Sequence, residues 1–356
     1  MHFLISIVIA FLVAWAFRKR STPDPLGGWR LVACVTAAAL PHADRLFYVF
    51  NQSFGLLYQY TFMWSALLAP LFAFGLAQGF SVISGGTQPE SKRTCMRFFV
   101  PVFATFVFNI ALAVLSENGV ALFAPLWFGR VSLSVLHSFD VGLLIGLIVF
   151  ALLVLMLNRW KTDIARIVLA LLIVYVGIVG TFKAKAYQVG KRYGVSMGLS
   201  VEKVHTLPQP LSPFYWRIVV LTTDGRLHAT RISLKRSNPV EITPDMNAIE
   251  RAKAVYMPIH TAVWRIYNRY GNQNPDFVHQ GWQSDVSKSL AWISRFAVFQ
   301  EMRTYQNMPC AQLKDLRFDG RKEAHLGTYL LCQADDGWQA YQAAGEASFL
   351  RLDAIY

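Results

Sequence analysis

Long apolar runs in the first half of the chain constrain its fold more than any other feature. Residues 1–182 hold nearly all of these runs, whereas residues 183–356 have the composition of a water-soluble domain. Over all 356 residues, 54% are hydrophobic and only 15% are charged, which is too apolar for an ordinary soluble protein. The pattern therefore predicts a membrane-embedded part followed by an extramembrane part.

The apolar runs predict an α-helical multi-pass membrane bundle of about six spans, because about 20 apolar residues cross a bilayer as a helix. The first run lacks a basic start and a cleavage site of small residues, so it predicts an anchor helix and not a removed signal peptide. A shorter apolar piece at 120–128 predicts a re-entrant or interfacial segment. The expected spans are residues 3–17, 30–50, 54–83, 98–115, 135–157 and 164–182.

Lysines and arginines in the loops predict the orientation of the bundle. With alternating spans, ten of them fall on one side and two, Arg45 and Arg130, on the other; the ten are Arg18, Lys19, Arg20, Arg30, Lys92, Arg93, Arg97, Arg159, Lys161 and Arg166. Positive loops stay cytoplasmic, so the N-terminus and the C-terminal domain are expected on the outer, periplasmic-type side. Membrane lipids are the expected partners. No basic run with interleaved aromatics predicts a nucleic-acid partner, and the oligomeric state stays open.

The predicted domains are a transmembrane domain at 1–185, a polar linker at 186–206 and an α+β extramembrane domain at 207–356. Asp224-Gly225 between two apolar runs predicts a β-hairpin with a type I′ turn. Helices are expected at 246–270, interrupted near Pro258, and at 286–297. Further strands are expected at 310–318, 326–333 and 337–342.

The four cysteines divide between the two predicted compartments. Cys310 and Cys332 both lie in the outer domain, where an oxidising environment favours a disulfide, although two unpaired thiols are the alternative. Cys34 lies in a predicted span and Cys95 in a predicted cytoplasmic loop, where thiols stay reduced. The chain contains no CxxC or HExxH motif, so zinc sites of those types are not expected.

Polar residues at the end of the second run are candidates for function. The stretch Leu40-Pro41-His42-Ala43-Asp44-Arg45 places an acid and a base at the edge of an apolar segment, where charge is costly and commonly functional. The structural alternative is a helix end with Asp44 as a cap and Arg45 reaching the headgroups. Two residues apart on a helix, His42 and Asp44 point in different directions. Both bind one ion only if the backbone is irregular after Pro41.

Other polar residues in the apolar half also have both a functional and a structural interpretation. His137 and Asp140 have the i,i+3 spacing of a shared ligand pair, although a buried polar pair or a helix cap is more common. Asn109 fits an interhelical hydrogen bond. Glu117, beside Asn118-Gly119, is expected to be a solvated turn residue.

The run from Leu40 to Pro70 resembles the signature region of bacterial inner-membrane metal-dependent hydrolases of the YdjM/YbcI type. That family carries a Leu-Pro-Asp-x-Asp motif, matched here by Leu40, Pro41 and Asp44, with His42 where the family has aspartate. Matches to its later motifs and to the tail of its longer members are Ser65, Ala69-Pro70, Asn109, Ala113, Ser116, Gly119, Ala124-Pro125, Asp140, 210–216 and 315–318.

Departures from this family fall on its metal ligands. Gln59 and Trp64 stand where the second motif has two histidines, and Asn109 and Ala113 stand where the third has histidine and aspartate. The resemblance implies a divalent metal, zinc or manganese, at His42, Asp44, Asp140 and Asn109, with His42 and Asp44 catalytic. The lost ligands equally fit a protein without any metal, because such ions want several carboxylate or imidazole ligands.

Two functions follow from these observations. The first is a membrane-bound metal-dependent hydrolase of the inner membrane, whose metal-activated water attacks an amphiphile such as a lipid phosphoester. The second is a non-catalytic membrane scaffold that presents a periplasmic binding or regulatory domain to a protein partner. A transporter is a distant third, since no inverted repeat is evident.

Overall fold

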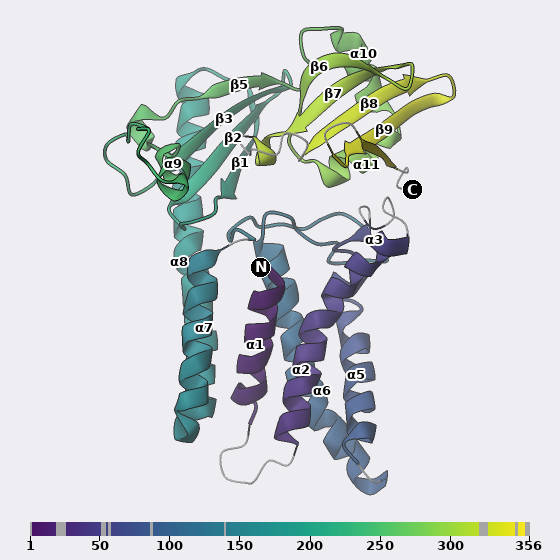
Figure 1. The fold of residues 1–356 in the computed structure, drawn as a ribbon, viewed down its shortest axis with the longest axis vertical. Helices are drawn as coiled ribbons and strands as arrows, with labels where there is room; N and C mark the ends of the chain where they lie inside the picture. The colour runs from purple at the N-terminus through teal and green to yellow at the C-terminus, as the bar shows by residue number, and fades with distance from the viewer. Residues whose placement is uncertain are drawn as a thin grey trace.

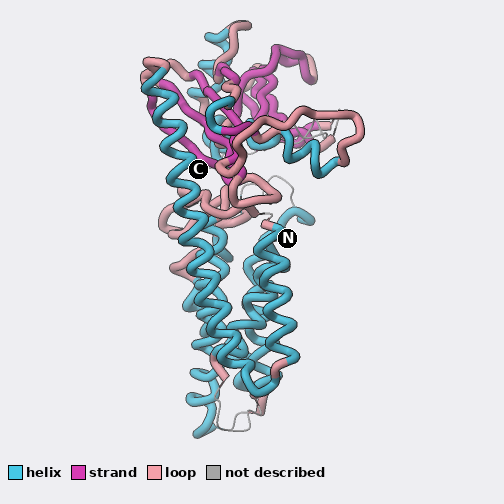
Figure 2. The backbone as a smooth tube through the Cα atoms, turned by 90° about the vertical axis from the view of Figure 1, so that its left-hand side faces the viewer, coloured by secondary structure: helices cyan, strands magenta, loops and turns pink. Residues whose placement is uncertain are grey.

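The computed structural model places a layer of long helices on one side of the molecule and two β-sheets on the other (Figure 1). It describes residues 2–18, 26–50, 55, 58–85, 88–138, 140–319, 327–345 and 348–352. Loop segments lie between the helices and the sheets, as the second view shows (Figure 2).

Helices account for most of the described residues before Met197, and several begin or end at proline or at a polar cap. Pro41 lies in the first turn of η1, which follows α2, and a proline lies in the first turn of α5. Asp140 caps α7 by accepting a hydrogen bond from the Leu143 amide at 2.9 Å. The helices are α1 (His2–Ala16), α2 (Gly27–Ala39), α3 (Phe47–Phe50), α5 (Ala69–Ile83), α6 (Gln88–Leu115), α7 (Val141–Met156) and α8 (Lys161–Ser196), with 3₁₀ turns η1 (Leu40–Leu46), η2 (Phe62–Trp64) and η3 (Asn158–Trp160).

The predicted six-span bundle is wrong. Among the described residues, only Arg93–Leu115 and Lys161–Ser196 are helices long and apolar enough to cross a membrane. The apolar helices α1 and α5 have 15 residues each and α7 has 16, which at 1.5 Å per residue is about 22–24 Å, short of a 30 Å hydrocarbon core. The apolar windows at 30–50 and 54–83 were too long because η1 and the turns at 59–68 interrupt the α-helix.

The predicted interfacial segment at 120–128 forms no helix. Residues 116–138, here called the cap loop, are irregular backbone joined by isolated bridges between Ser116 and Leu136 and between Val120 and Val131. The Ala66 and Ala121 amides donate to the Leu122 and Tyr60 carbonyls, so the cap loop is bonded to the turns before α5. Backbone polar groups in this irregular region are thus partly satisfied without a helix.

The C-terminal half is richer in strands than the predicted α+β domain, with two five-stranded sheets among its described residues. The first sheet has the order β1-β2-β3-β4 with β5 also paired to β3, and the second has the order β10-β9-β8-β7-β6. The strands are β1 (Val201–Pro208), β2 (Tyr215–Thr222), β3 (Arg226–Ser233), β4 (Met257–Pro258), β5 (Arg265–Asn268), β6 (Ala297–Tyr305), β7 (Met308–Asp315), β8 (Thr328–Ala334), β9 (Gly337–Ala343) and β10 (Phe349–Leu352). Short helices α9 (Ala248–Ala254), α10 (Pro275–Gln283) and α11 (Val286–Ile293) and 3₁₀ turns η4 (Ile259–Thr261) and η5 (Leu316–Phe318) complete this half.

The predicted hairpin is present, but its turn is not type I′. Strands β2 and β3 pair antiparallel, with Leu221 opposite Leu227. Of the two turn residues only Gly225 has a positive φ, at 80°, whereas a type I′ turn needs positive φ at both central positions. The loop at 223–225 is therefore a three-residue connection that uses glycine in the left-handed region.

The predicted helices of this half are shorter than expected. The helix at 246–270 is α9 only, because residues from Met257 onward form β4, η4 and β5. The helix at 286–297 ends at Ile293, and β6 begins at Ala297. The strands predicted at 310–318 and 337–342 correspond to β7 and β9, although 316–318 form η5. Of the strand predicted at 326–333, residues 328–333 lie in β8.

The predicted polar linker at 186–206 is mostly helix and strand. Helix α8 continues to Ser196 and β1 begins at Val201, so most of the predicted linker is regular structure. Helix α8 packs closely on the first sheet: a Cβ atom on Gly190 would lie 2.7 Å from the side chains of Ile218 and Val204. One continuous helix thus runs from the helical layer to the face of the first sheet (Figure 1).

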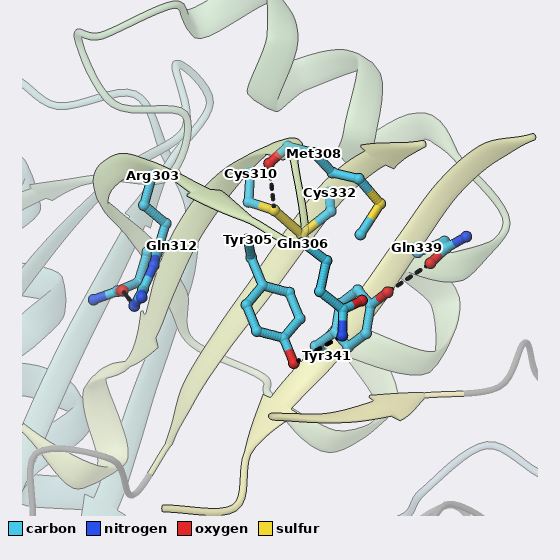
Figure 3. Close-up of a disulfide and its surroundings, with 9 residues drawn as sticks. All are labelled: Arg303, Tyr305, Gln306, Met308, Cys310, Gln312, Cys332, Gln339 and Tyr341. Carbon is cyan, nitrogen blue, oxygen red and sulfur yellow. Dashed lines mark hydrogen bonds between the residues drawn. A yellow bond between two sulfur atoms is a disulfide. The ribbon is translucent and has the colours of Figure 1, made fainter. Parts of the chain in front are cut away.

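The predicted disulfide is confirmed in the second sheet. Cys310 on β7 and Cys332 on β8 lie opposite each other in register and are bonded. The rings of Tyr305 and Tyr341 meet edge to face beside them, with centroids 5.3 Å apart (Figure 3). On the chain-entropy model, closing a loop of 22 residues stabilises the fold by about 3 kcal/mol. Cys34 and Cys95 are free and buried.

Candidate functional site

The predicted site residues His42 and Asp44 both contact one fully buried side chain, Trp64. The segment after α2 is a 3₁₀ helix, so the backbone after Pro41 departs from α geometry. The His42 ring meets the Trp64 ring edge to face with centroids 5.0 Å apart, and the Asp44 carboxylate accepts a hydrogen bond from Trp64 Nε1 at 3.2 Å. We call His2, His42, Asp44, Tyr60 and Trp64 the polar cluster.

Asp44 acts as a hydrogen-bond acceptor for the backbone that follows α3. Its Oδ2 atom accepts from the Tyr60 amide at 2.7 Å as well as from Trp64 Nε1. Tyr60 has a φ of 63°, which is unfavourable for a bulky residue, so this contact fixes a strained turn. Burial raises the pKa of the Asp44 carboxyl, and the two hydrogen bonds oppose that rise. The Asp44 carboxyl therefore has a structural role. Its ionised and its protonated form can both accept hydrogen bonds, so each can hold this turn at least in part.

His42 lies among aromatic rings. Its ring packs against Phe3 at 5.2 Å and His2 at 5.9 Å between centroids. Among the described residues, His42 Nε2 and His2 Nδ1 are buried and accept or donate no hydrogen bond. His2 was not predicted from the sequence, where its only signal is an imidazole at the start of an apolar helix.

Asn109 and Asp140, the other two predicted ligands, do not join this cluster through any described contact. Asn109 is fully buried in α6, and within the described residues its amide makes no hydrogen bond, so the expected interhelical bond is not formed. Asp140 caps α7 and accepts a hydrogen bond from the Tyr175 hydroxyl of α8 at 2.7 Å. The cap, one of the two structural alternatives, accounts for Asp140.

His137 pairs with Glu117 instead of with Asp140. His137 Nε2 lies 3.5 Å from a Glu117 carboxylate oxygen, and the other oxygen accepts from the Ser138 amide at 3.2 Å. The Glu117 side chain is only 16% exposed. The expectation of a solvated turn residue is therefore wrong, because Glu117 connects the two ends of the cap loop.

The implied metal set does not fit this arrangement. Within the parts of the chain that the structure describes, no three His, Cys, Asp or Glu side chains are grouped so that they could hold a metal ion. Divalent zinc or manganese sites need three or more such ligands. One Asp44 oxygen already accepts two hydrogen bonds. The Asp140 carboxylate already accepts one hydrogen bond from the first turn of α7 and one from Tyr175.

An apolar groove lies between α7 and α8, beside Asp140. It has a volume of about 420 Å³, is lined mainly by leucine, glycine and phenylalanine, and has Asp140 and Tyr175 as its polar residues. Pro213, in the turn before β2, also lines it. A groove of this shape suits an acyl chain better than a polar substrate, since its polar groups already bond to each other.

Comparisons with protein-family models, with curated proteins and with solved structures find no match to this chain.

Proposed function

We propose that the protein is a non-catalytic membrane scaffold, in which the helical layer is held in a bilayer and the two-sheet half is presented outside it as a binding domain. Exposed apolar side chains on α7 and α8 support the membrane placement. Ile145, Leu152 and Ile173 are each more than half exposed, although all three are apolar. Apolar faces of this extent are typical of helices in lipid or at an interface.

Basic side chains gather at the end of the helical layer away from the sheets, and they support an orientation. Arg30 Nε and Arg166 Nε donate to the carbonyls of Ala14 and Ala16 at 2.9 Å, and Lys161 lies over the Trp15 ring. These cations lie at the C-terminal end of α1, which the helix dipole favours. Under the positive-inside rule this end is cytoplasmic, so the sheets lie on the outer side.

Helix α8 supports the presenting role. It is one of the two helices long enough to span a bilayer, and its last turns pack on β1 and β2. Helix α8 thus carries the first sheet as a rigid stem, and the disulfide of the second sheet suits an oxidising compartment. A protein ligand of this half is the partner class that a presented domain of two sheets would recruit.

The single observation that carries the non-catalytic proposal is the double use of one Asp44 oxygen. A carboxylate that fixes Tyr60 and Trp64 is needed for folding whether or not any chemistry occurs. Its substitution therefore separates the two roles.

Asp44→Asn and Asp44→Ala form a matched pair that tests this proposal. The amide oxygen of Asn can still accept from Tyr60 and Trp64, so we expect its unfolding free energy to stay within about 1 kcal/mol of the wild type. Ala leaves both donors buried without an acceptor and should cost about 2–4 kcal/mol. Thermal and denaturant unfolding of the detergent-purified chain measures this. Equal stability of the wild type and Asp44→Ala would contradict the structural role.

The metal-dependent hydrolase is the second candidate, and one observation favours it. His42 and His2 lie in adjacent rings, each with a buried nitrogen that has no partner among the described residues, and such nitrogens are potential ligands. Under this reading, His42→Ala would remove bound zinc or manganese.

A further inference from the structure

A pocket lined by three arginines lies where the cap loop meets the second sheet. Its lining includes Arg130 of the cap loop, Trp292 of α11, Arg295 before β6 and Arg317 of η5, together with Glu117 and Asn118, and we call it the arginine pocket. Its volume is about 170 Å³, which is sufficient for a small oxyanion. Neither the polar cluster nor the groove between α7 and α8 shares a residue with it.

Two of the three guanidinium groups in this pocket have no ion-pair partner within the described part of the chain. Arg317 is paired with Asp315, whose Oδ2 accepts from its Nε at 2.9 Å and from its Nη2 at 2.7 Å. Glu117 is engaged with His137 and the Ser138 amide. Among the described residues, Arg130 and Arg295 form no ion pair, so positive charge is in excess between them.

Arg130 is held in place and still has donor capacity. Its guanidinium lies 4.4 Å from the centroid of the Trp292 ring, and Nη2 donates to the Gln59 carbonyl at 3.2 Å. Its Nε is buried and without a partner among the described residues. Burial, followed by the charges of Arg317 and Arg295, lowers the pKa of Arg130 to about 10. Three cations that repel one another at a partly buried site are stabilised by an anion.

We propose that the arginine pocket binds a phosphate group. A carboxylate is satisfied by one forked guanidinium, whereas a tetrahedral phosphate offers oxygens to donors from several sides, as these three elements provide. This inference rests on the proposed role as a membrane-bound binding protein. It specifies that the ligand bound between the cap loop and the second sheet contains a phosphate group. The phosphate has two sources, a lipid headgroup at the membrane surface or a soluble phosphate compound.

Two probes with matched controls distinguish the sources. The full chain in detergent is titrated with inorganic phosphate against chloride of equal ionic strength, and with phosphatidylglycerol against diacylglycerol in mixed micelles. A rise of the unfolding midpoint with phosphatidylglycerol alone assigns a lipid phosphate, and a rise with inorganic phosphate assigns a soluble one. If neither probe raises the midpoint above its control, the proposal is overturned.

Variants locate the effect in this pocket. Arg295→Gln and Arg130→Gln come from different elements, and each should require about tenfold more probe for the same midpoint shift, as expected for losing one charged hydrogen bond. Arg130→Lys keeps the charge and should retain most of the binding if Arg130→Gln alone fails to fold. Arg303→Gln removes an exposed arginine of β6 outside the pocket and should behave as the wild type.

The proposed phosphate site can be disproved without disproving the proposed scaffold function. Equal weakening in Arg303→Gln and Arg295→Gln would show general charge attraction and overturn the site. The stability of the Asp44 pair does not depend on any phosphate, so it continues to test the scaffold proposal by itself.

Discussion

At the scale of single residues, His205 joins the two sheets. It lies on β1, and its ring meets the ring of Phe296, just before β6, edge to face at 4.9 Å between centroids. Burial, followed by the charges of Lys203 and Arg295, lowers the pKa of His205 to about 4. The neutral imidazole is therefore the form that fits this contact between sheets.

The lowered pKa of His205 predicts a pH dependence of stability. Because the folded pKa lies below the unfolded value of about 6.5, the unfolded chain binds more protons between these values. Stability is full above about pH 6.5 and falls as the pH drops toward 4. We expect His205→Phe to reduce the loss of the unfolding midpoint between pH 7 and 5, as measured by thermal scans. His260→Phe, at an exposed position, should leave the loss unchanged.

The sequence identified candidate polar residues in the apolar half, but not the side chains that they contact. It marked His42 and Asp44 and required an irregular backbone after Pro41, which η1 provides. It treated Trp64 only as a lost ligand, although Trp64 is the side chain that both residues contact. Such contacts depend on how distant turns meet, and local spacing does not encode this.

At the scale of elements, α8 carries the first sheet through close contact at glycine. Gly190 faces Ile218 and Val204 of the sheet, whereas a Cβ on Gly177 of the same helix would meet no atom within 4 Å. The prediction of a polar linker at 186–206 missed this contact, because the polar residues after Lys185 do not show that the helix continues. Helical continuity instead follows from packing against β1 and β2, which overrides local propensity.

Gly190→Ala and Gly177→Ala test the stem directly. The Gly190 variant places a methyl group 2.7 Å from two side chains, so we expect a lower unfolding midpoint and easier proteolysis between the halves. The Gly177 variant adds helix propensity without a clash and should leave the midpoint unchanged or raise it. A Gly190 variant as stable as the Gly177 variant would contradict the close packing of α8 on the sheet.

At the scale of the whole molecule, the sequence predicted an apolar helical half followed by a half that contains strands, but it overestimated the number of spans and underestimated the strand content. Hydropathy counts residues without regard to backbone, so residues 40–46 and 59–68 counted as helix although they form 3₁₀ turns and irregular structure. After Val201 the sequence predicted the hairpin around Asp224-Gly225 and the strands at 310–318, 326–333 and 337–342. Of the strands that were not predicted, β5 pairs with the non-adjacent β3, whereas β1, β6 and β10 pair with the strand next to them in the chain, so their strand character depends on the sheet context.

The central claim is that the polar cluster holds the fold together and does not hold a catalytic metal. Mass spectrometry of metal content tests it most directly, on detergent-purified protein that has met no chelator and has been offered excess zinc and manganese. The wild type, Asp44→Asn and His42→Ala should all show metal only at the background level of the buffer. Close to one zinc or manganese ion per wild-type chain, lost in both variants, would contradict the claim and favour the hydrolase.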